Sequence, residues 1–91
     1  MSKTYYLGFT RAGHPIGRAS LNNYGYTYAA VSLTDEGVPS SHLPSFSSSL
    51  EGAKRNLFSG FGMINHPYEV VKVAIVDGRT YRKAMKVKAN G

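Results

Sequence analysis

The side chains that could catalyse a reaction or hold a metal ion are few and scattered. The three histidines, His14, His42 and His66, lie far apart and lack the spacing typical of metal sites. The chain has no cysteine, which excludes a thiol nucleophile, a disulfide framework and a cysteine zinc site. Serines are plentiful, but no Gly-x-Ser-x-Gly motif occurs. We therefore expect no metal, no cofactor and no nucleophilic triad.

The carboxylates are too few to suggest acid–base catalysis. There are five Asp and Glu residues, and two of them already have structural interpretations. Glu51 fits a helix-capping pattern, and Asp77 fits a turn. Little remains for a general acid and a general base. The sequence predicts a binding protein and not an enzyme.

Basic side chains are concentrated near the end of the sequence. Five of the eleven Lys and Arg residues fall between residues 79 and 88: Arg79, Arg82, Lys83, Lys86 and Lys88. Such a density of cations is typical of phosphate binding, although lysines also protect the exposed edge strands of sheets. The net charge of +6 favours nucleic acid, acidic protein surfaces or anionic lipid as partners. It excludes an acidic mimic of DNA.

Three tyrosines recur at a spacing of two residues, at Tyr24, Tyr26 and Tyr28. On a strand this spacing places them on one face. Exposed aromatic rings on a sheet can stack with nucleic-acid bases, and tyrosine is also enriched at protein interfaces. The alternative is that the three rings pack against a neighbouring strand.

These residues need a scaffold, and the stretch from Tyr68 to Val76 is the natural centre of one. It is rich in valine, and β-branched side chains favour strands. Val71, Val73 and Ile75 would form one wholly apolar face, on which we expect a helix to pack. The opposite face is interrupted only by Lys72.

The first third of the chain predicts a meander of up to three antiparallel strands. Residues 3–11 alternate, with Tyr5, Leu7 and Phe9 on one face and Tyr6, Gly8 and Thr10 on the other, which predicts a half-buried strand. Residues 16–21 and 24–33 would follow as the second and third strands. Residues 34–47 contain Pro, Gly and several serines without periodicity, which predicts a long loop.

One helix is predicted after this loop. Ser48 to Glu51 has the form of a capping box. An apolar stripe at helical spacing follows it, consisting of Leu50, Ala53, Leu57, Phe58 and Phe61.

The last segment can be interpreted in two ways. Asp77-Gly78 is a hairpin signal and predicts that residues 79–88 return as a strand. However, Tyr81, Ala84, Met85 and Lys88 also have helical spacing. The hairpin signal favours the strand.

Together these elements predict a single α+β domain over residues 1–91. It would have a small antiparallel sheet of four or five strands with one helix packed on one face, in the order β-β-β-α-β-β. A core this small leaves only a few kcal/mol of net stability, so we expect a homodimer or a stabilising partner. No apolar run approaches the roughly 18 residues that span a bilayer, and no signal-peptide pattern is visible. These features favour a cytoplasmic location and no membrane partner.

Three segments carry a resemblance to a group of known proteins. They are Tyr26–Val31, Phe46–Ser49 leading into Ala53, and Tyr68–Val73. Their layout resembles that of small tailed-bacteriophage proteins of the host-takeover or anti-defence kind, including anti-CRISPR-like inhibitors. The resemblance implies an inhibitor that acts in the host cytoplasm by docking on a host protein or nucleoprotein complex.

The residues themselves suggest where a partner would bind. The expected partner-binding surface combines the aromatic and basic residues: Tyr24, Tyr26, Tyr28, Arg79, Arg82, Lys83, Lys86 and Lys88. The alternative function is direct binding of DNA or RNA by the C-terminal basic segment, folded as a hairpin.

Overall fold

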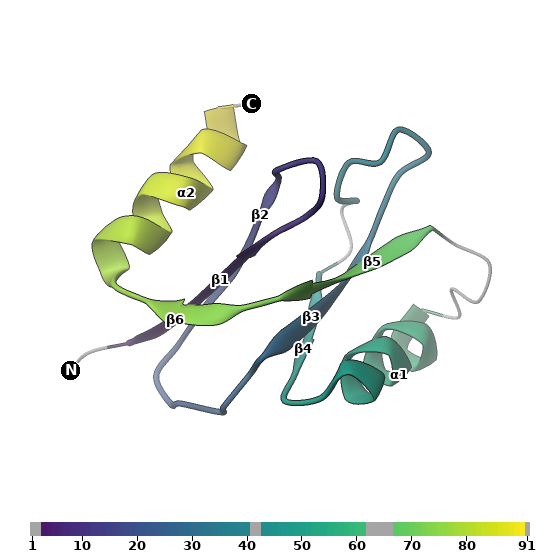
Figure 1. Ribbon diagram of the computed structural model, residues 1–91, viewed down its shortest axis with the longest axis horizontal. Coiled ribbons are helices and arrows are strands. Elements are labelled where there is room, and N and C mark those ends of the chain that lie inside the picture. Colours follow the sequence, from purple (N-terminus) through teal and green to yellow (C-terminus); the bar gives the residue numbers. More distant parts are fainter. Residues whose placement is uncertain (1–2, 41–42, 62–66, 91) are drawn as a thin grey trace.

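The computed structural model describes residues 3–40, 43–61 and 67–90. It confirms the α+β class (Figure 1). The elements are β1 Thr4–Phe9, β2 Pro15–Ser20, β3 Tyr28–Ser32, β4 Ser45–Ser47, α1 Leu50–Phe61, β5 Tyr68–Lys72, β6 Ala74–Val76 and α2 Gly78–Asn90. The prediction of one helix and the order β-β-β-α-β-β are both wrong, because a short strand lies within the expected loop and the last segment is helical.

The strands form two antiparallel sheets that are linked by the segment Tyr68–Val76. The first sheet has the order β2-β1-β6, and the second has the order β4-β3-β5. Only Val73 separates β5 from β6, and its amide donates a hydrogen bond of 2.9 Å to the Thr27 carbonyl. The predicted extended segment is therefore confirmed. The predicted single sheet of four or five strands is wrong, because this segment pairs with β3 over its first half and with β1 over its second half.

The main core lies between the inner faces of the two sheets. Its buried members come from every strand except β6 and from the junction between β5 and β6: Tyr6, Ile16, Ala29, Val31, Phe46, Val71 and Val73. The backbones of β1 and β5 approach closely here, because a Cβ at Gly8 would fall on the Lys72 carbonyl. Glycine permits an approach that no other residue would allow.

Helix α1 packs on the outer face of the second sheet. Ala53 and Leu57 are fully buried against Ala30, with Tyr28 and Val70 beside them. We expected the helix on the face of Val71 and Val73, and that prediction is wrong. The other sheet covers that face, so the helix packs on the Val70 side.

Two further details differ from expectation, the residue that caps α1 and the burial of Ile75 at the end of the predicted apolar face. Ser49, and not Ser48, caps the helix by accepting a hydrogen bond of 3.0 Å from the Gly52 amide. Ile75 remains 56% exposed and does not contribute to the core.

The predicted third strand is shorter than expected. β3 begins at Tyr28, and the residues before it form a turn that is held by a buried hydroxyl group. The Tyr6 hydroxyl donates to the Asn23 side chain (3.1 Å) and accepts from the Tyr24 amide (2.8 Å). Gly25 has a φ of +70°, a conformation that favours glycine. Because Tyr24 and Tyr26 lie in this connection, the three tyrosines do not share one strand face.

The C-terminal segment is a helix, which corrects the predicted strand over residues 79–88. Asp77 caps it, with its Oδ1 accepting a hydrogen bond of 2.7 Å from the Thr80 amide. A type I′ hairpin would need positive φ at residues 77 and 78. Within the described ranges, positive φ occurs only at Gly13, Gly25 and Gly37. The Asp-Gly pair therefore starts a helix here and does not close a hairpin.

Replacing Tyr6 by Phe should destabilise the fold by about 1–2 kcal/mol, because the Tyr24 amide loses its acceptor. Chemical denaturation measures this change as a lower midpoint at constant slope. Tyr5→Phe, on the opposite face of the same strand, is the matched control. Equal stability of the Tyr6→Phe variant and the wild type would show that the hydroxyl does not hold this turn.

Replacing Asp77 by Ala should lower the melting temperature and the helical circular dichroism signal at neutral pH. Hydrogen bonds from the Thr80 side chain and amide lower the pKa of Asp77 from 3.8. The contribution of Asp77 to folding stability is therefore fully present above its unfolded-state pKa. It is lost as the pH falls through the lower pKa of the folded state.

The difference in melting temperature between wild type and Asp77→Ala should stay constant down to about pH 5 and narrow below pH 3.8. Asp35→Ala, which removes an exposed loop carboxylate, is the control. A difference that widens in acid would contradict the capping role.

Candidate functional site

Helix α2 is held against the outer face of the first sheet (Figure 1). The rings of Tyr81 and Tyr5 lie 5.0 Å apart between centroids. Gly17 of β2 lies beneath the helix, and a Cβ there would come within 2.7 Å of the Tyr81 ring and 3.1 Å of the Met85 sulfur. Burial, with a smaller contribution from Tyr5, raises the pKa of Tyr81. One side of α2 is thus anchored to the sheet.

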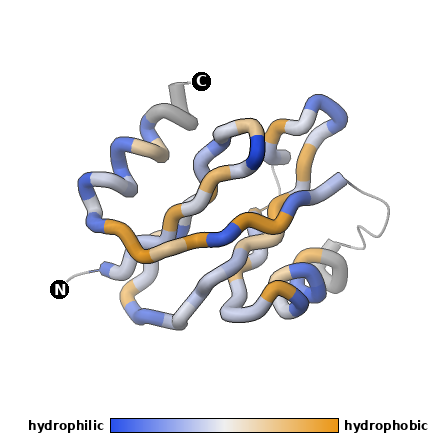
Figure 2. The backbone as a smooth tube through the Cα atoms, in the orientation of Figure 1, coloured by the Kyte–Doolittle hydropathy of each residue, from blue (hydrophilic) through white to orange (hydrophobic). Residues whose placement is uncertain are grey.

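The opposite side of α2 carries a row of cations. Arg79, Arg82, Lys83 and Lys86 are all exposed. Their spacing of three and four residues places them on one side of the helix, which we call the basic stripe. No Asp or Glu occurs between residues 78 and 90, so the helix offers no internal carboxylate to pair with these charges. Figure 2 shows hydrophilic residues recurring along α2, next to the hydrophobic β6.

The fifth predicted cation, Lys88, belongs to α2, but its side chain lies outside what the structure describes. The structure therefore brings four of the five predicted basic residues onto one surface. It does so by a different element from the one expected, a helix in place of a hairpin strand.

The predicted tyrosines are distributed over two places. Tyr26 is partly buried, with ring centroids 5.0 Å from Tyr6 and 5.4 Å from Tyr24, and the Arg18 guanidinium carbon lies 5.4 Å from its ring. Tyr24 is 52% exposed. We call Arg18, Tyr24 and Tyr26 the aromatic cluster. Tyr28 instead packs beside Ala53 and Leu57 under α1.

The aromatic cluster and the basic stripe lie on different faces of the first sheet. Arg18 follows Gly17 along β2, and successive strand residues point to opposite faces. Gly17 contacts α2, so Arg18 points away from that helix. The expected single surface of tyrosines and cations is therefore divided in two.

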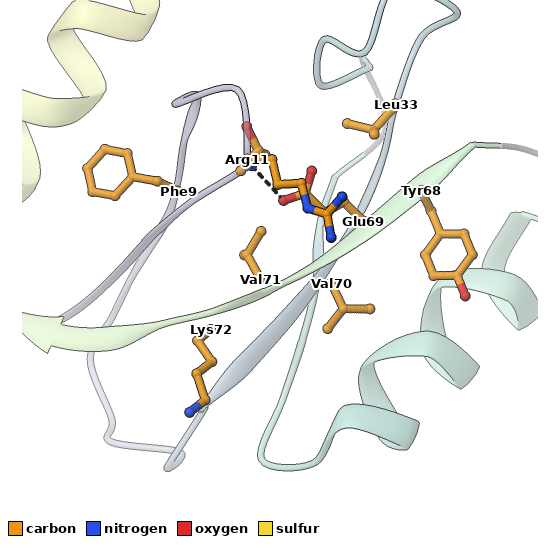
Figure 3. A pocket seen from close by; sticks show the side chains of 9 residues that line it. Phe9, Arg11, Leu33, Tyr68, Glu69, Val70, Val71 and Lys72 are labelled. Atoms are coloured by element: carbon orange, nitrogen blue, oxygen red, sulfur yellow. Dashed lines mark hydrogen bonds between the residues drawn. The ribbon is translucent and has the colours of Figure 1, made fainter.

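An open hollow of about 660 Å³ lies where the end of β1 meets β5. The Arg11 amide donates a hydrogen bond of 2.8 Å to Glu69 Oε2 at this hollow (Figure 3). In this view the Lys72 and Tyr68 side chains extend away from that pair. The described lining residues include one carboxylate, Glu69, and no histidine.

A second groove, of about 460 Å³, runs between α2 and the first sheet. Its lining is mostly apolar and consists of Leu7, Phe9, Gly13, Pro15, Val76, Thr80, Lys83 and Ala84. Phe9 is 54% exposed at its edge. The sequence placed Phe9 on one face of a half-buried strand but did not predict this groove, because the groove exists only once residues 78–90 are a helix.

The described residues contain no group of three or more His, Cys, Asp or Glu that could hold a metal ion. His14 lies in the turn after β1, where its amide donates to the Thr10 hydroxyl (3.1 Å). His42 and His66 lie outside the described residues. Over the parts of the chain that are described, no helix is long and apolar enough to cross a membrane.

Comparisons with known proteins offer no further guide to this site. No protein-family model, curated protein or solved structure matches the chain. The resemblance to bacteriophage proteins thus stays a prediction.

Proposed function

We propose that this chain is a non-enzymatic binding protein that docks on the phosphate backbone of nucleic acid, either free or within a nucleoprotein complex. The basic stripe of α2 is the observation that carries the proposal. It presents four exposed cations from one side of a helix whose other side is anchored to a sheet.

The charge arrangement suits a polyanion better than an isolated anion. From Arg79 to Lys86 the stripe extends about 10 Å along the helix axis, enough to face more than one phosphate group. Residues 78–90 contain no carboxylate, and the Asp77 carboxylate at the start of the helix interacts electrostatically with only one residue of the stripe, Arg82. Release of counterions from the nucleic acid would then drive binding.

The same arrangement predicts that the protein has little preference for the base sequence of the nucleic acid. Lys and Arg side chains that contact phosphates position a protein on nucleic acid without reading the bases. In addition, the half-exposed ring of Tyr24 lies away from the basic stripe, because the aromatic cluster is on the other face of the first sheet.

Docking on a host protein, as the bacteriophage resemblance implies, is the second candidate. The observation in its favour is the aromatic cluster. The exposed Tyr24 ring contacts the Tyr26 ring, and the Arg18 guanidinium lies over the Tyr26 ring. Tyr and Arg are the residues that most often dominate binding energy at protein interfaces.

The first candidate predicts that the double variant Arg82→Gln/Lys86→Gln binds labelled RNA and DNA oligonucleotides at least about tenfold more weakly at low salt. The slope of log affinity against log salt should fall by about 1.4 for single strands, at roughly 0.7 for each lost phosphate contact. Fluorescence anisotropy across a salt series measures both values.

Lys54→Gln/Arg55→Gln is the matched control, because it removes the same net charge from α1. Equal losses in the two double variants would mean that net charge alone drives binding. If the wild type fails to bind any oligonucleotide at low salt, the proposal is wrong.

The second candidate makes a separate prediction. If the wild-type chain captures a host protein, substitution of Arg18→Gln and Tyr24→Ala should abolish that binding. The Arg82→Gln/Lys86→Gln variant should still bind the same host protein. The opposite pattern would assign that capture to the basic stripe and remove the aromatic cluster from the interface.

A further inference from the structure

The basic stripe and the apolar groove share one side chain. Lys83 belongs to the exposed row of cations on α2 and also lines the groove between α2 and the first sheet. A positive charge therefore stands at the rim of an apolar recess. A ligand bound there would combine an anionic group with a flat or bulky apolar part.

Phe9 provides an aromatic ring at the edge of the same recess. Its side chain is 54% exposed, although it is the last residue of β1. Figure 3 shows the Phe9 side chain pointing toward α2 and away from Glu69, although Phe9 also belongs to the lining of the hollow beside Glu69. The ring thus faces the groove and leaves much of its surface open to a ligand.

The size and lining of the groove suit one planar group. Its volume of about 460 Å³ lies within the roughly 300–1,000 Å³ range of small-ligand sites. Leu7, Pro15 and Val76 supply apolar surface, and the Thr80 side chain lies at the same groove. A nucleobase has apolar faces that stack on an aromatic ring and a polar edge that remains close to water.

We infer that the chain binds single-stranded nucleic acid, with one unstacked base in this groove against Phe9 and the neighbouring phosphates on the basic stripe. The inference rests on the proposed function and names the form of nucleic acid that the surface accepts. Bases of a duplex are paired and stacked inside the helix, so they cannot enter the groove without being extruded. Single strands offer free bases and phosphates together.

The test compares Phe9→Leu with Phe9→Tyr. Leucine retains an apolar side chain but removes the aromatic face, whereas tyrosine retains the ring. Phe9→Leu should weaken binding of single-stranded oligonucleotides about tenfold, and Phe9→Tyr should bind as the wild type does. Because no phosphate contact is lost, the salt slope should be the same in all three proteins. Duplex affinity should not change.

Tyr24→Leu is the matched control, since its ring has nearly the same exposure (52%) but lies in the aromatic cluster. It should leave single-strand affinity unchanged. Thermal unfolding of each variant establishes that the fold is intact. Photocrosslinking of a 4-thiouracil oligonucleotide should join the base to the segments 7–15 or 76–84, which contain the residues that line the groove.

Two results would overturn the inference while leaving the proposed function standing. One is an unchanged single-strand affinity in Phe9→Leu together with a loss in Arg82→Gln/Lys86→Gln. The other is tighter binding of duplexes than of single strands. If the loss occurs in Tyr24→Leu instead, the base stacks on the aromatic cluster and not in the groove. An unchanged affinity in Arg82→Gln/Lys86→Gln would count against the proposed function itself.

Discussion

The structure depends on one extended segment, Tyr68–Val76, that pairs with a different sheet along each half. Its first half continues the second sheet through β3, and its second half continues the first sheet through β1. The hydrogen bond from the Val73 amide to the Thr27 carbonyl marks the change from one sheet to the other. Because the segment cannot move in one sheet without moving in the other, it holds the two inner faces over a common core.

This shared segment also decides where the helices can lie. With the inner faces covered by each other, only the outer faces remain for α1 and α2. The chain leaves β6 and enters α2 after a single residue, Asp77, whose side chain caps the helix. Gly17 then allows α2 to approach the sheet closely. The direction in which the basic stripe points is thus a consequence of how β6 ends.

The two surfaces available for binding differ in character. The basic stripe is polar and exposed, and the groove beside it is apolar, with Lys83 common to both. The aromatic cluster lies on the other face of the first sheet. A partner that needs charge and an aromatic contact together would find both near Phe9 and Lys83, which were not expected to lie near each other.

The sequence by itself determined the α+β class, the extended segment from Tyr68 to Val76 and the identity of the basic residues. These features follow from local alternation, β-branched content and composition, which act within a few residues. The sequence did not determine which face of that segment receives a helix, because Val70 and Val71 are both apolar. The first sheet covers the Val71 face and so leaves the Val70 face for the helix. Nor did it decide between strand and helix after Asp77, since an Asp-Gly pair suits a hairpin turn and a helix cap alike. Packing of Tyr81 and Met85 on Tyr5 and Gly17 made that choice, and with it the basic stripe and the groove.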